Sequence, residues 1–306
     1  MILQIPVLFL ALVIDRVCGD PRTPLHPVAL IGQFIGWWGR PERYPAGFQV
    51  LSGVIGWMMT VALFSVPFLL FQIYAPWFLY LCIAPFLLKI CFALRALEEH
   101  AESVASALTP DERAIQASFL VSRDTSVLTE EQVLSAAYES VAENLNDSII
   151  APLFWFLILG LPGAALYRAA NTMDAMLGYR DERKKIGWFA ARMDDILSYI
   201  PARICGAVLL LIYAGKRRLK PAVETFCHDR KKRPGFNGGI PMSLIAGGEG
   251  IQFEKPGVYQ IGTRIITLRE AGPSIIRTIR LSTLLFCFVA SIALVLLDGA
   301  PNIYGI

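Results

Sequence analysis

The sequence is poor in charged residues and contains very few histidines. Lysine, arginine, aspartate and glutamate make up 17% of the 306 residues, and there are 3 histidines. The formal net charge of +3 is too small to indicate a nucleic-acid partner, and no basic tract carries interleaved aromatic residues. No group of histidines and cysteines has the spacing of a zinc site. The composition therefore argues against nucleic-acid binding and against zinc chemistry.

Several common catalytic patterns are also missing. No G-x-x-x-x-G-K-[ST] motif occurs, so we expect Gly238, Gly239, Gly247, Gly248 and Gly250 to form turns rather than a phosphate-binding loop. The absence of a Ser-His-Asp arrangement and of a Cys-His pair argues against a nucleophile supplied by the protein. The six cysteines include no C-x-x-C pair, which predicts reduced, structural thiols.

Apolar residues are abundant instead. They make up 55% of the chain, and the mean hydropathy is +0.52, well beyond an ordinary soluble domain. Runs long enough for membrane helices cover residues 1 to about 15, 51–74, 76–94 and 278–297. The first run lacks a basic n-region and an A-x-A site, so we expect it to remain as a helix. The sequence predicts an integral membrane protein.

Two further apolar runs, 149–161 and 204–214, are too short to cross a membrane comfortably. We expect them to be re-entrant or half-spanning helices that line a cavity. Basic residues lie between the two runs and after the second, which favours the cytoplasm for these regions. The expected fold class is all-α: a polytopic helical membrane protein with a large polar helical region facing the cytoplasm.

We interpret the chain as one membrane domain with four parts. These are N-terminal membrane helices and a loop (1–94), a helical region that bears the site (95–203), a short apolar helix with a glycine-rich polar segment (204–277), and a C-terminal membrane helix (278–306). In the second part we expect helices over 93–108 and 111–121, and a further helix whose N-cap is Thr129.

Three carboxylates in this region recur every four residues. Glu139, Glu143 and Asp147 would lie on one face of an α-helix, and the apolar residues keep the same period. Like charges so placed repel, which indicates a cationic partner: either a divalent metal ion or the arginines nearby. A solvated helix face is the ordinary alternative. Asn144 adds a polar group to the same cluster.

A second polar cluster follows on a helix expected to start at residues 162–163 and to end near Gly178. Arg168, Asn171 and Asp174 share one face of that helix. Arginine suits phosphate or carboxylate, and aspartate suits Mg²⁺, although structural ion pairs would also use both. The polar residues that continue the pattern are Tyr179, Arg180, Arg192, Asp194, Asp195 and Arg203.

Two loops add further candidates. Arg123 and Asp124, in the loop over residues 122–126, are placed to hold a phosphate and a metal ion respectively, and Thr125 lies beside them. His26 lies in a turn-rich loop after the first helix, although a single histidine is more often a structural residue than a ligand.

The motifs that carry these residues follow one another in a specific order. They are DRVCGDPRTPLHPVALIG (15–32), SRDTS (122–126), ESVAEN (139–144) followed by Asp147, APLFW (151–155), YRAANTMDAMLGYR (167–180) and ARMDDILSYIPAR (191–203). This order resembles the CobD/CbiB family of cobalamin biosynthesis, the adenosylcobinamide-phosphate synthases. The resemblance covers most of the chain, and residues 234–262 fit the pattern less closely.

The resemblance implies an ATP-dependent reaction with Mg²⁺. It would join the carboxylate of adenosylcobyric acid to the amine of (R)-1-amino-2-propanol or of its O-phosphate. In that scheme acids bind a metal ion or the amine, arginines hold phosphates, and Asn171 orients the carboxyl group. The candidate catalytic residues are Glu139, Glu143, Asn171, Asp174, Asp194 and Asp195; the binding residues are His26, Arg123, Asp124, Thr125, Asn144, Arg168, Tyr179, Arg180, Arg192 and Arg203; the metal ligands are Glu143, Asp147 and Asp174.

Two other classes of function remain open from the sequence. Intramembrane Asp15 and the two short apolar runs are also typical of transporters, in which broken helices bind ions. A non-catalytic scaffold or sensor for neighbouring membrane-bound cobamide-assembly enzymes would use the same site for binding alone. The expected partners are the two small-molecule substrates and the lipid bilayer, with self-association open, and the expected location is the inner or plasma membrane.

Overall fold

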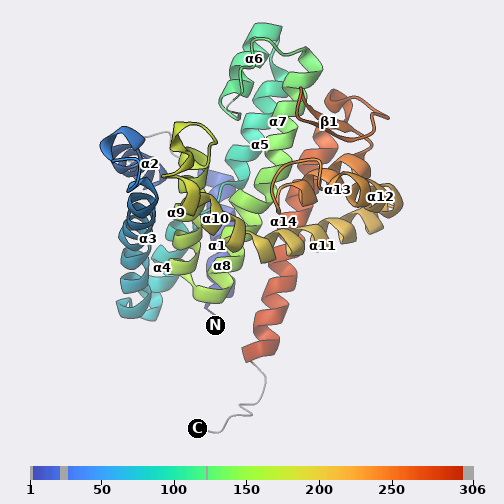
Figure 1. Ribbon diagram of the computed structural model, residues 1–306. Helices are drawn as coiled ribbons and strands as arrows, with labels where there is room; N and C mark the ends of the chain where they lie inside the picture. The colour runs from blue at the N-terminus through green and yellow to red at the C-terminus, as the bar shows by residue number, and fades with distance from the viewer. Residues whose placement is uncertain (1–2, 21–26, 122, 299–306) are drawn as a thin grey trace. The chain divides into compact units, whose positions relative to one another are not determined.

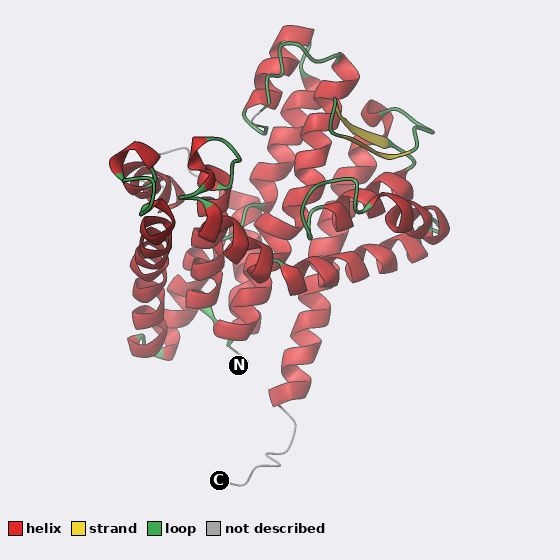
Figure 2. Cartoon of the chain, viewed as in Figure 1, coloured by secondary structure: helices red, strands yellow, loops and turns green. Residues whose placement is uncertain are grey.

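The computed structural model describes residues 3–20, 27–121 and 123–298. Within these ranges the chain is helical almost throughout, as the apolar runs predict, and Figure 2 shows one small β-hairpin in yellow. The expected all-α membrane fold is confirmed. The hairpin is an addition to it that the sequence analysis did not predict.

Three helical stretches among the described residues are long and apolar enough to cross a membrane. They are Gln49–Tyr74, Trp77–Ser106 and Leu268–Asp298, and a fourth would exist if Trp188–Leu197 and Tyr199–Gly215 formed one interrupted span. The membrane helices predicted over 51–74, 76–94 and 278–297 are therefore confirmed. The N-terminal helix has only 15 residues, too few to belong to this set, because about 20 are needed for the hydrocarbon core.

The chain forms two compact units, each built from separate stretches of sequence. The first unit contains residues 1–93, 151–197 and 287–306, and the second contains residues 94–150 and 198–286. The elements are coloured and labelled along the chain in Figure 1. The last helix, α14 (Leu268–Asp298), begins in the second unit and ends in the first.

Helix α9 (Leu161–Leu177) is at the centre of the first unit, where it packs against α2, α3, α4, α8 and α10. Its small residues Ala164, Ala165, Ala169 and Ala170 are fully buried and let the neighbouring backbones approach closely. The other elements of this unit are α1 (Gln4–Cys18), α2 (Pro27–Trp38), η1 (Pro41–Arg43), α3 (Gln49–Tyr74), α4 (Trp77–Lys89), α8 (Ala151–Leu159), η3 (Glu182–Lys184) and α10 (Trp188–Leu197).

Glycines in α3 determine how closely that helix packs. A Cβ atom at Gly53 would lie 2.1 Å from the carbonyl oxygen of Ile186, and one at Gly56 would lie 2.4 Å from the ring of Trp38. Both values are far below van der Waals contact. The loop before α10 is therefore fixed against the Gln49 end of a membrane-spanning helix.

In the second unit, helix α7 (Glu130–Asn144) packs against α5, α6, α13 and strand β1. Its predicted N-cap is confirmed, because the Thr129 hydroxyl accepts from the Gln132 N–H and the Gln132 side chain accepts from the Thr129 N–H. The other elements are α5 (Leu94–Ser106), α6 (Pro110–Ser118), η2 (Leu145–Ile150), α11 (Tyr199–Gly215), α12 (Leu219–Asp229), α13 (Gly239–Glu249), β1 (Gln252–Lys255) and β2 (Tyr259–Gly262).

The structure refines one expectation in the C-terminal half and corrects another. The apolar run 204–214 lies within α11, a helix of 17 residues that is still shorter than the roughly 20 residues needed for a full span. The glycine-rich segment does not form turns throughout, because Gly239, Gly247 and Gly248 lie in the wholly buried helix α13. Of the five glycines, Gly250 does take the left-handed conformation (φ 73°) and ends that helix.

Candidate functional site

The predicted site residues divide between the two units. Arg123, Asp124, Thr125, Glu139, Glu143, Asn144, Asp147 and Arg203 belong to the second unit; Arg168, Asn171, Asp174, Tyr179, Arg180, Arg192, Asp194 and Asp195 belong to the first. His26 lies outside the described residues.

The buried carboxylate of Glu139 is the centre of a group in the second unit that we call the α7 cluster: Arg123, Ser135, Glu139, Glu143, Arg233 and Tyr259. Glu139 accepts hydrogen bonds from the Ser135 hydroxyl at 2.6 Å, from the Arg123 guanidinium at 2.8 Å and from the Tyr259 hydroxyl at 2.8 Å. The hairpin is fixed to the same place, since the backbone N–H of Glu254 donates to Ser135 at 2.7 Å.

The burial of Glu139 has an electrostatic consequence. Only 4% of the residue is exposed, and this burial raises the pKa of Glu139 above the ordinary value of a glutamate. The hydrogen bonds from Ser135 and Tyr259 and the charge of Arg123 act in the opposite direction. Glu139 is therefore a desolvated acid held in place by three donors, which is the kind of environment that acid–base groups have.

The second acid of the predicted stripe also meets an arginine. Glu143 forms an ion pair with Arg233. Burial acts against the charge of Arg233, but the carboxylates of Glu143 and Asp147 offset that effect and raise the pKa of Arg233 above its ordinary value. Of the two cationic partners considered for the stripe, arginine is the one that Glu139 and Glu143 contact in this structure.

The stripe itself is not a continuous α-helical face, which corrects the sequence expectation. Helix α7 ends at Asn144, and Asp147 lies in the π-helical segment η2. The Asn146 amide donates to Asp147 at 2.7 Å, and Asn144 accepts from the Ser148 hydroxyl at 2.6 Å. Single turns of π-helix are rare and often occur at functional sites.

Other predicted residues of the second unit make local contacts. Asp124 accepts from the backbone N–H and the hydroxyl of Ser126, which lowers its pKa, and Thr125 donates to the carbonyl of Ala114 at 2.7 Å. The Arg203 guanidinium donates to the Asn237 side chain at 2.7 Å and stacks over Tyr199. These contacts stabilise turns and helix ends.

In the first unit, helices α9 and α10 present the residues of the second predicted cluster. The Asn171 amide donates to the buried carboxylate of Asp194 at 3.2 Å. Arg168 is half-buried, and its Nε atom has no hydrogen-bond partner among the residues that the structure describes. A Cβ atom at Gly178 would lie 2.1 Å from the Asp174 carboxylate, so glycine is needed where the predicted helix end occurs.

A cavity of about 330 Å³, the basic cavity, lies beside this cluster. Its cationic side chains come from the loop after α9 and from the first turns of α10, and Asp195 contributes a carboxylate 3.7 Å from Arg192. The structure thus brings four predicted site residues to one concave surface. The residues that line it are Gly178, Tyr179, Arg180, Lys184, Gly187, Trp188, Ala191, Arg192 and Asp195.

The loop that forms one wall of the basic cavity is tightly held. Arg183 forms an ion pair with Asp181, donates to the carbonyl of Met176 at 3.0 Å and lies over the ring of Tyr179. Hydrogen bonds from Arg183 lower the pKa of Asp181 to about 2. At Gly187 a Cβ atom would lie 1.9 Å from the carbonyl oxygen of Leu177, so the two backbones are in direct contact.

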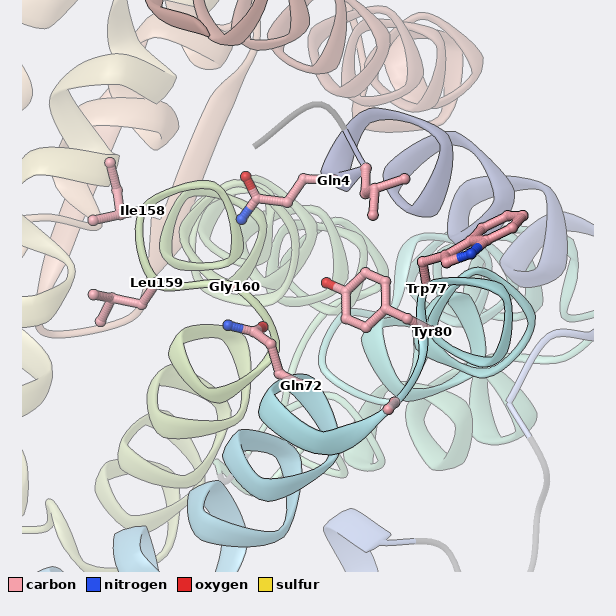
Figure 3. A pocket seen from close by; sticks show the side chains of 9 residues that line it. Gln4, Gln72, Trp77, Tyr80, Ile158, Leu159 and Gly160 are labelled. Atoms are coloured by element: carbon pink, nitrogen blue, oxygen red, sulfur yellow. The ribbon is translucent and has the colours of Figure 1, made fainter. Parts of the chain in front are cut away.

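A larger cavity, of about 610 Å³, lies at the opposite end of α3. Figure 3 shows the side chains of Gln4, Gln72 and Tyr80 directed toward its middle. Gln4 donates to the carbonyl of Phe156 at 3.1 Å, and Gln72 accepts from the N–H of Leu161 at 2.8 Å, so both amides fix helix ends. Among the residues that the structure describes, the lining carries no charged side chain and none of the predicted site residues.

The acidic side chains of the described residues do not form a preformed metal-binding site. No group of three or more His, Cys, Asp or Glu side chains in these parts of the chain is close enough to hold a metal ion. A metal ion at Glu143 would have to replace the guanidinium of Arg233. Asp195 in the basic cavity fits Mg²⁺ better, because this ion commonly uses one or two carboxylates and completes its shell with substrate phosphates and water.

Several residues of both groups were missed by the sequence analysis. Tyr259 and Arg233 reach α7 from segments about 90 to 120 residues further along the chain, and no periodic pattern connects them. A signal existed for the hairpin, since a Pro-Gly pair at 256–257 separates two short alternating segments. Lys184 and Trp188 of the basic cavity had no such signal.

Comparisons with known proteins agree with the motif order. The sequence model of a family described as "CobD/Cbib protein" matches residues 8–282. The chain is 38% identical to the "Probable cobalamin biosynthesis protein CobD" of Methanothermobacter thermautotrophicus, covering 85% of this chain and 87% of that protein. It is 42% identical to the protein of the same name from Thermococcus kodakarensis (82% and 83% covered) and 38% identical to the "Cobalamin biosynthesis protein CobD" of Dehalococcoides mccartyi (85% and 87%). No solved structure matches. The chain therefore belongs to the CobD/Cbib protein family.

Proposed function

We propose that this protein is an adenosylcobinamide-phosphate synthase, which joins adenosylcobyric acid to (R)-1-amino-2-propanol or its O-phosphate with ATP and Mg²⁺. The observation that carries the proposal is the match to one family over residues 8–282, which includes every motif that holds the candidate site residues from Arg123 to Arg203. The arginines and acids of both units supply the charges that such substrates need.

A carboxylate and an amine do not condense unaided in water, so the carboxylate has to be activated. ATP would transfer its γ-phosphoryl group to a carboxylate oxygen of the corrinoid, and ADP would leave. The amine nitrogen then attacks the acyl carbon, the bond from that carbon to the phosphate-bearing oxygen breaks, and phosphate leaves. The amine loses its proton to a carboxylate, and an amide is formed.

The residues of the first unit suit the phosphate part of this chemistry. Arg180 and Arg192 line the basic cavity and can neutralise charge that develops on a transferring phosphoryl group. Mg²⁺ would supply further neutralisation there, with Asp195 as a protein ligand. Asn171 and Asp194, joined by a hydrogen bond, can orient the carboxyl group and accept the proton of the amine.

The α7 cluster suits an amine or a proton transfer. Glu139 is desolvated and its pKa is raised, so it can exchange a proton near neutral pH more readily than an exposed glutamate. Arg123 contacts Glu139 through one nitrogen of its guanidinium, at 2.8 Å. A second nitrogen donates to the carbonyl of Glu254 at 3.4 Å, and the N–H groups not used in these two contacts can bind a phosphate.

The distribution of charge at the ends of α3 supports a cytoplasmic orientation of the basic cavity. One end of this helix packs against the loop that carries Arg180, Arg183, Lys184 and Lys185, while the described residues that line the cavity at its other end are uncharged. Cytoplasmic loops are enriched in lysine and arginine. ATP is available on that side of the plasma membrane.

The proposal is tested by following product mass. Purified protein in detergent is incubated with adenosylcobyric acid, aminopropanol phosphate, Mg²⁺ and ATP. We expect a mass gain equal to amide formation that requires ATP, and little product from an Asp194→Asn variant. A Glu224→Gln variant, which changes an exposed acid of α12, should retain full activity. Tight corrinoid binding without any product would contradict the ligase function and favour a carrier or a scaffold.

A further inference from the structure

The side chains of the basic cavity carry more positive charge than a single carboxylate or phosphate needs. Arg180, Lys184 and Arg192 line it together with one carboxylate, that of Asp195. Arg180 and Lys184 have no ion-pair partner among the residues that the structure describes, and Arg192 is 3.7 Å from Asp195. Two net positive charges in one cavity suit a ligand with several negative charges, such as a polyphosphate.

An aromatic side chain lies at the same cavity. Trp188 is the first residue of α10 and is 49% exposed. The other aromatic residue of the lining, Tyr179, already has the Arg183 guanidinium over its ring at 4.0 Å. Trp188 therefore offers an indole that no cation of the described residues covers, and half-exposed indoles of this kind stack on nucleobases.

The backbone adds to the positive electrostatic potential of the cavity and to its rigidity. Helix α10 begins at the cavity, so the positive end of its dipole lies beside the cations. The close backbone contact between Gly187 and Leu177 holds the start of α10 against the end of α9 without a side chain between them. The cavity is formed before any ligand arrives, and less binding energy is lost in ordering it.

We infer that the basic cavity is the nucleotide site: the polyphosphate of a nucleoside triphosphate lies against Arg180, Lys184 and Arg192, and the base stacks on Trp188. The inference rests on the proposed function for its requirement of ATP, and it adds Lys184 and Trp188 as binding residues. A volume of about 330 Å³ accepts a polyphosphate with its sugar but is too small to enclose a corrin ring with its side chains.

Direct binding measurements on the full-length protein in detergent test this inference. The two probes are an ATP analogue whose β,γ bridge cannot be hydrolysed and inorganic tripolyphosphate, each titrated in the presence of Mg²⁺. Lys184→Gln removes a phosphate contact and should weaken both probes by roughly 10-fold, less at high salt. Trp188→Leu should weaken binding of the nucleotide by about 5- to 150-fold, the range for loss of one stacked base, and should leave tripolyphosphate binding unchanged.

Lys185→Gln is the matched control. Lys185 is an exposed neighbour of Lys184 with the same charge, but it does not line the cavity, so its loss should change neither affinity by more than about twofold. Equal weakening by Lys184→Gln and Lys185→Gln would show a general field effect and overturn the inference. Wild-type affinities for both Lys184→Gln and Trp188→Leu would also overturn it.

The two proposals fail in different ways. If amide formation depends on ATP but these variants leave nucleotide affinity unchanged, the ligase function is supported and the nucleotide site lies elsewhere. If the variants change nucleotide affinity as expected but no amide is formed, the site is supported and the ligase function is refuted. Measuring binding and product formation on the same preparations separates these outcomes.

Discussion

The ion pair between Arg123 and Glu139 gives a prediction whose size follows from burial. The side chains are 16% and 5% exposed, and the shortest distance between their charged atoms is 2.8 Å. Glu139→Leu leaves the guanidinium of Arg123 partly buried without its carboxylate and also removes the acceptor of Tyr259. Loss of one partner of a buried pair costs about 3 to 5 kcal/mol, so we expect a loss of unfolding free energy near the lower end of that range.

The double variant Arg123→Met with Glu139→Leu should recover part of this loss, because no unpaired charge remains buried. The free energy of unfolding is measured in detergent for the wild type, both single variants and the double variant, and we expect a coupling energy of about 2 kcal/mol. The exposed pair Lys220 and Glu224, 4.0 Å apart, is the control, and its coupling should stay below about 0.5 kcal/mol. Additive losses at Arg123 and Glu139 would refute the reasoning.

Two further predictions concern buried contacts of α13. Gly248→Ala would place a Cβ atom 2.3 Å from the ring of buried Tyr213, so we expect a loss of about 1 to 3 kcal/mol in thermal or denaturant unfolding, whereas Gly215→Ala, with no atom within 4 Å, should be neutral or stabilising. Burial opposes the charge of Glu249, but hydrogen bonds, the first of them from Lys216, lower its pKa overall. A carboxylate with a lowered pKa stabilises the folded state at pH values above its unfolded-state pKa. This stabilisation is lost as the pH falls through the folded-state pKa. Between about pH 6 and 3, the free energy of unfolding should therefore fall more steeply with decreasing pH for the wild type than for Glu249→Gln. Equal slopes would exclude Glu249 as the cause of the pH dependence.

Features that depend on neighbouring residues could be predicted from the sequence. The N-cap at Thr129, the helix that ends at Gly178 and the long apolar helices α3 and α14 follow from local propensity, from backbone requirements at glycine and from hydropathy. Each of these signals lies within one turn of helix or within one span. Their confirmation reflects how much of this fold is local helix.

Features that depend on tertiary packing could not be predicted in the same way. The glycines of α13 resemble turn residues by composition, but they lie in a buried helix because Gly247 and Gly248 allow α12 and Tyr213 to approach. The partners of Glu139 and Glu143 are Arg123, Tyr259 and Arg233, which reach α7 from three other segments. Sequence spacing along α7 carries no information about them.

These partners change what mutations of the acidic residues can show. Glu139 and Glu143 each hold an arginine in place, so their removal disturbs the position of that arginine as well as any direct contact with substrate. A loss of activity alone therefore does not distinguish a catalytic acid from a structural partner. The double-mutant cycle of Arg123 and Glu139 makes the distinction possible, because it measures how strongly the pair contributes to folding stability. Only a loss of activity that persists after correction for that contribution, in protein that is still folded, assigns chemistry to Glu139.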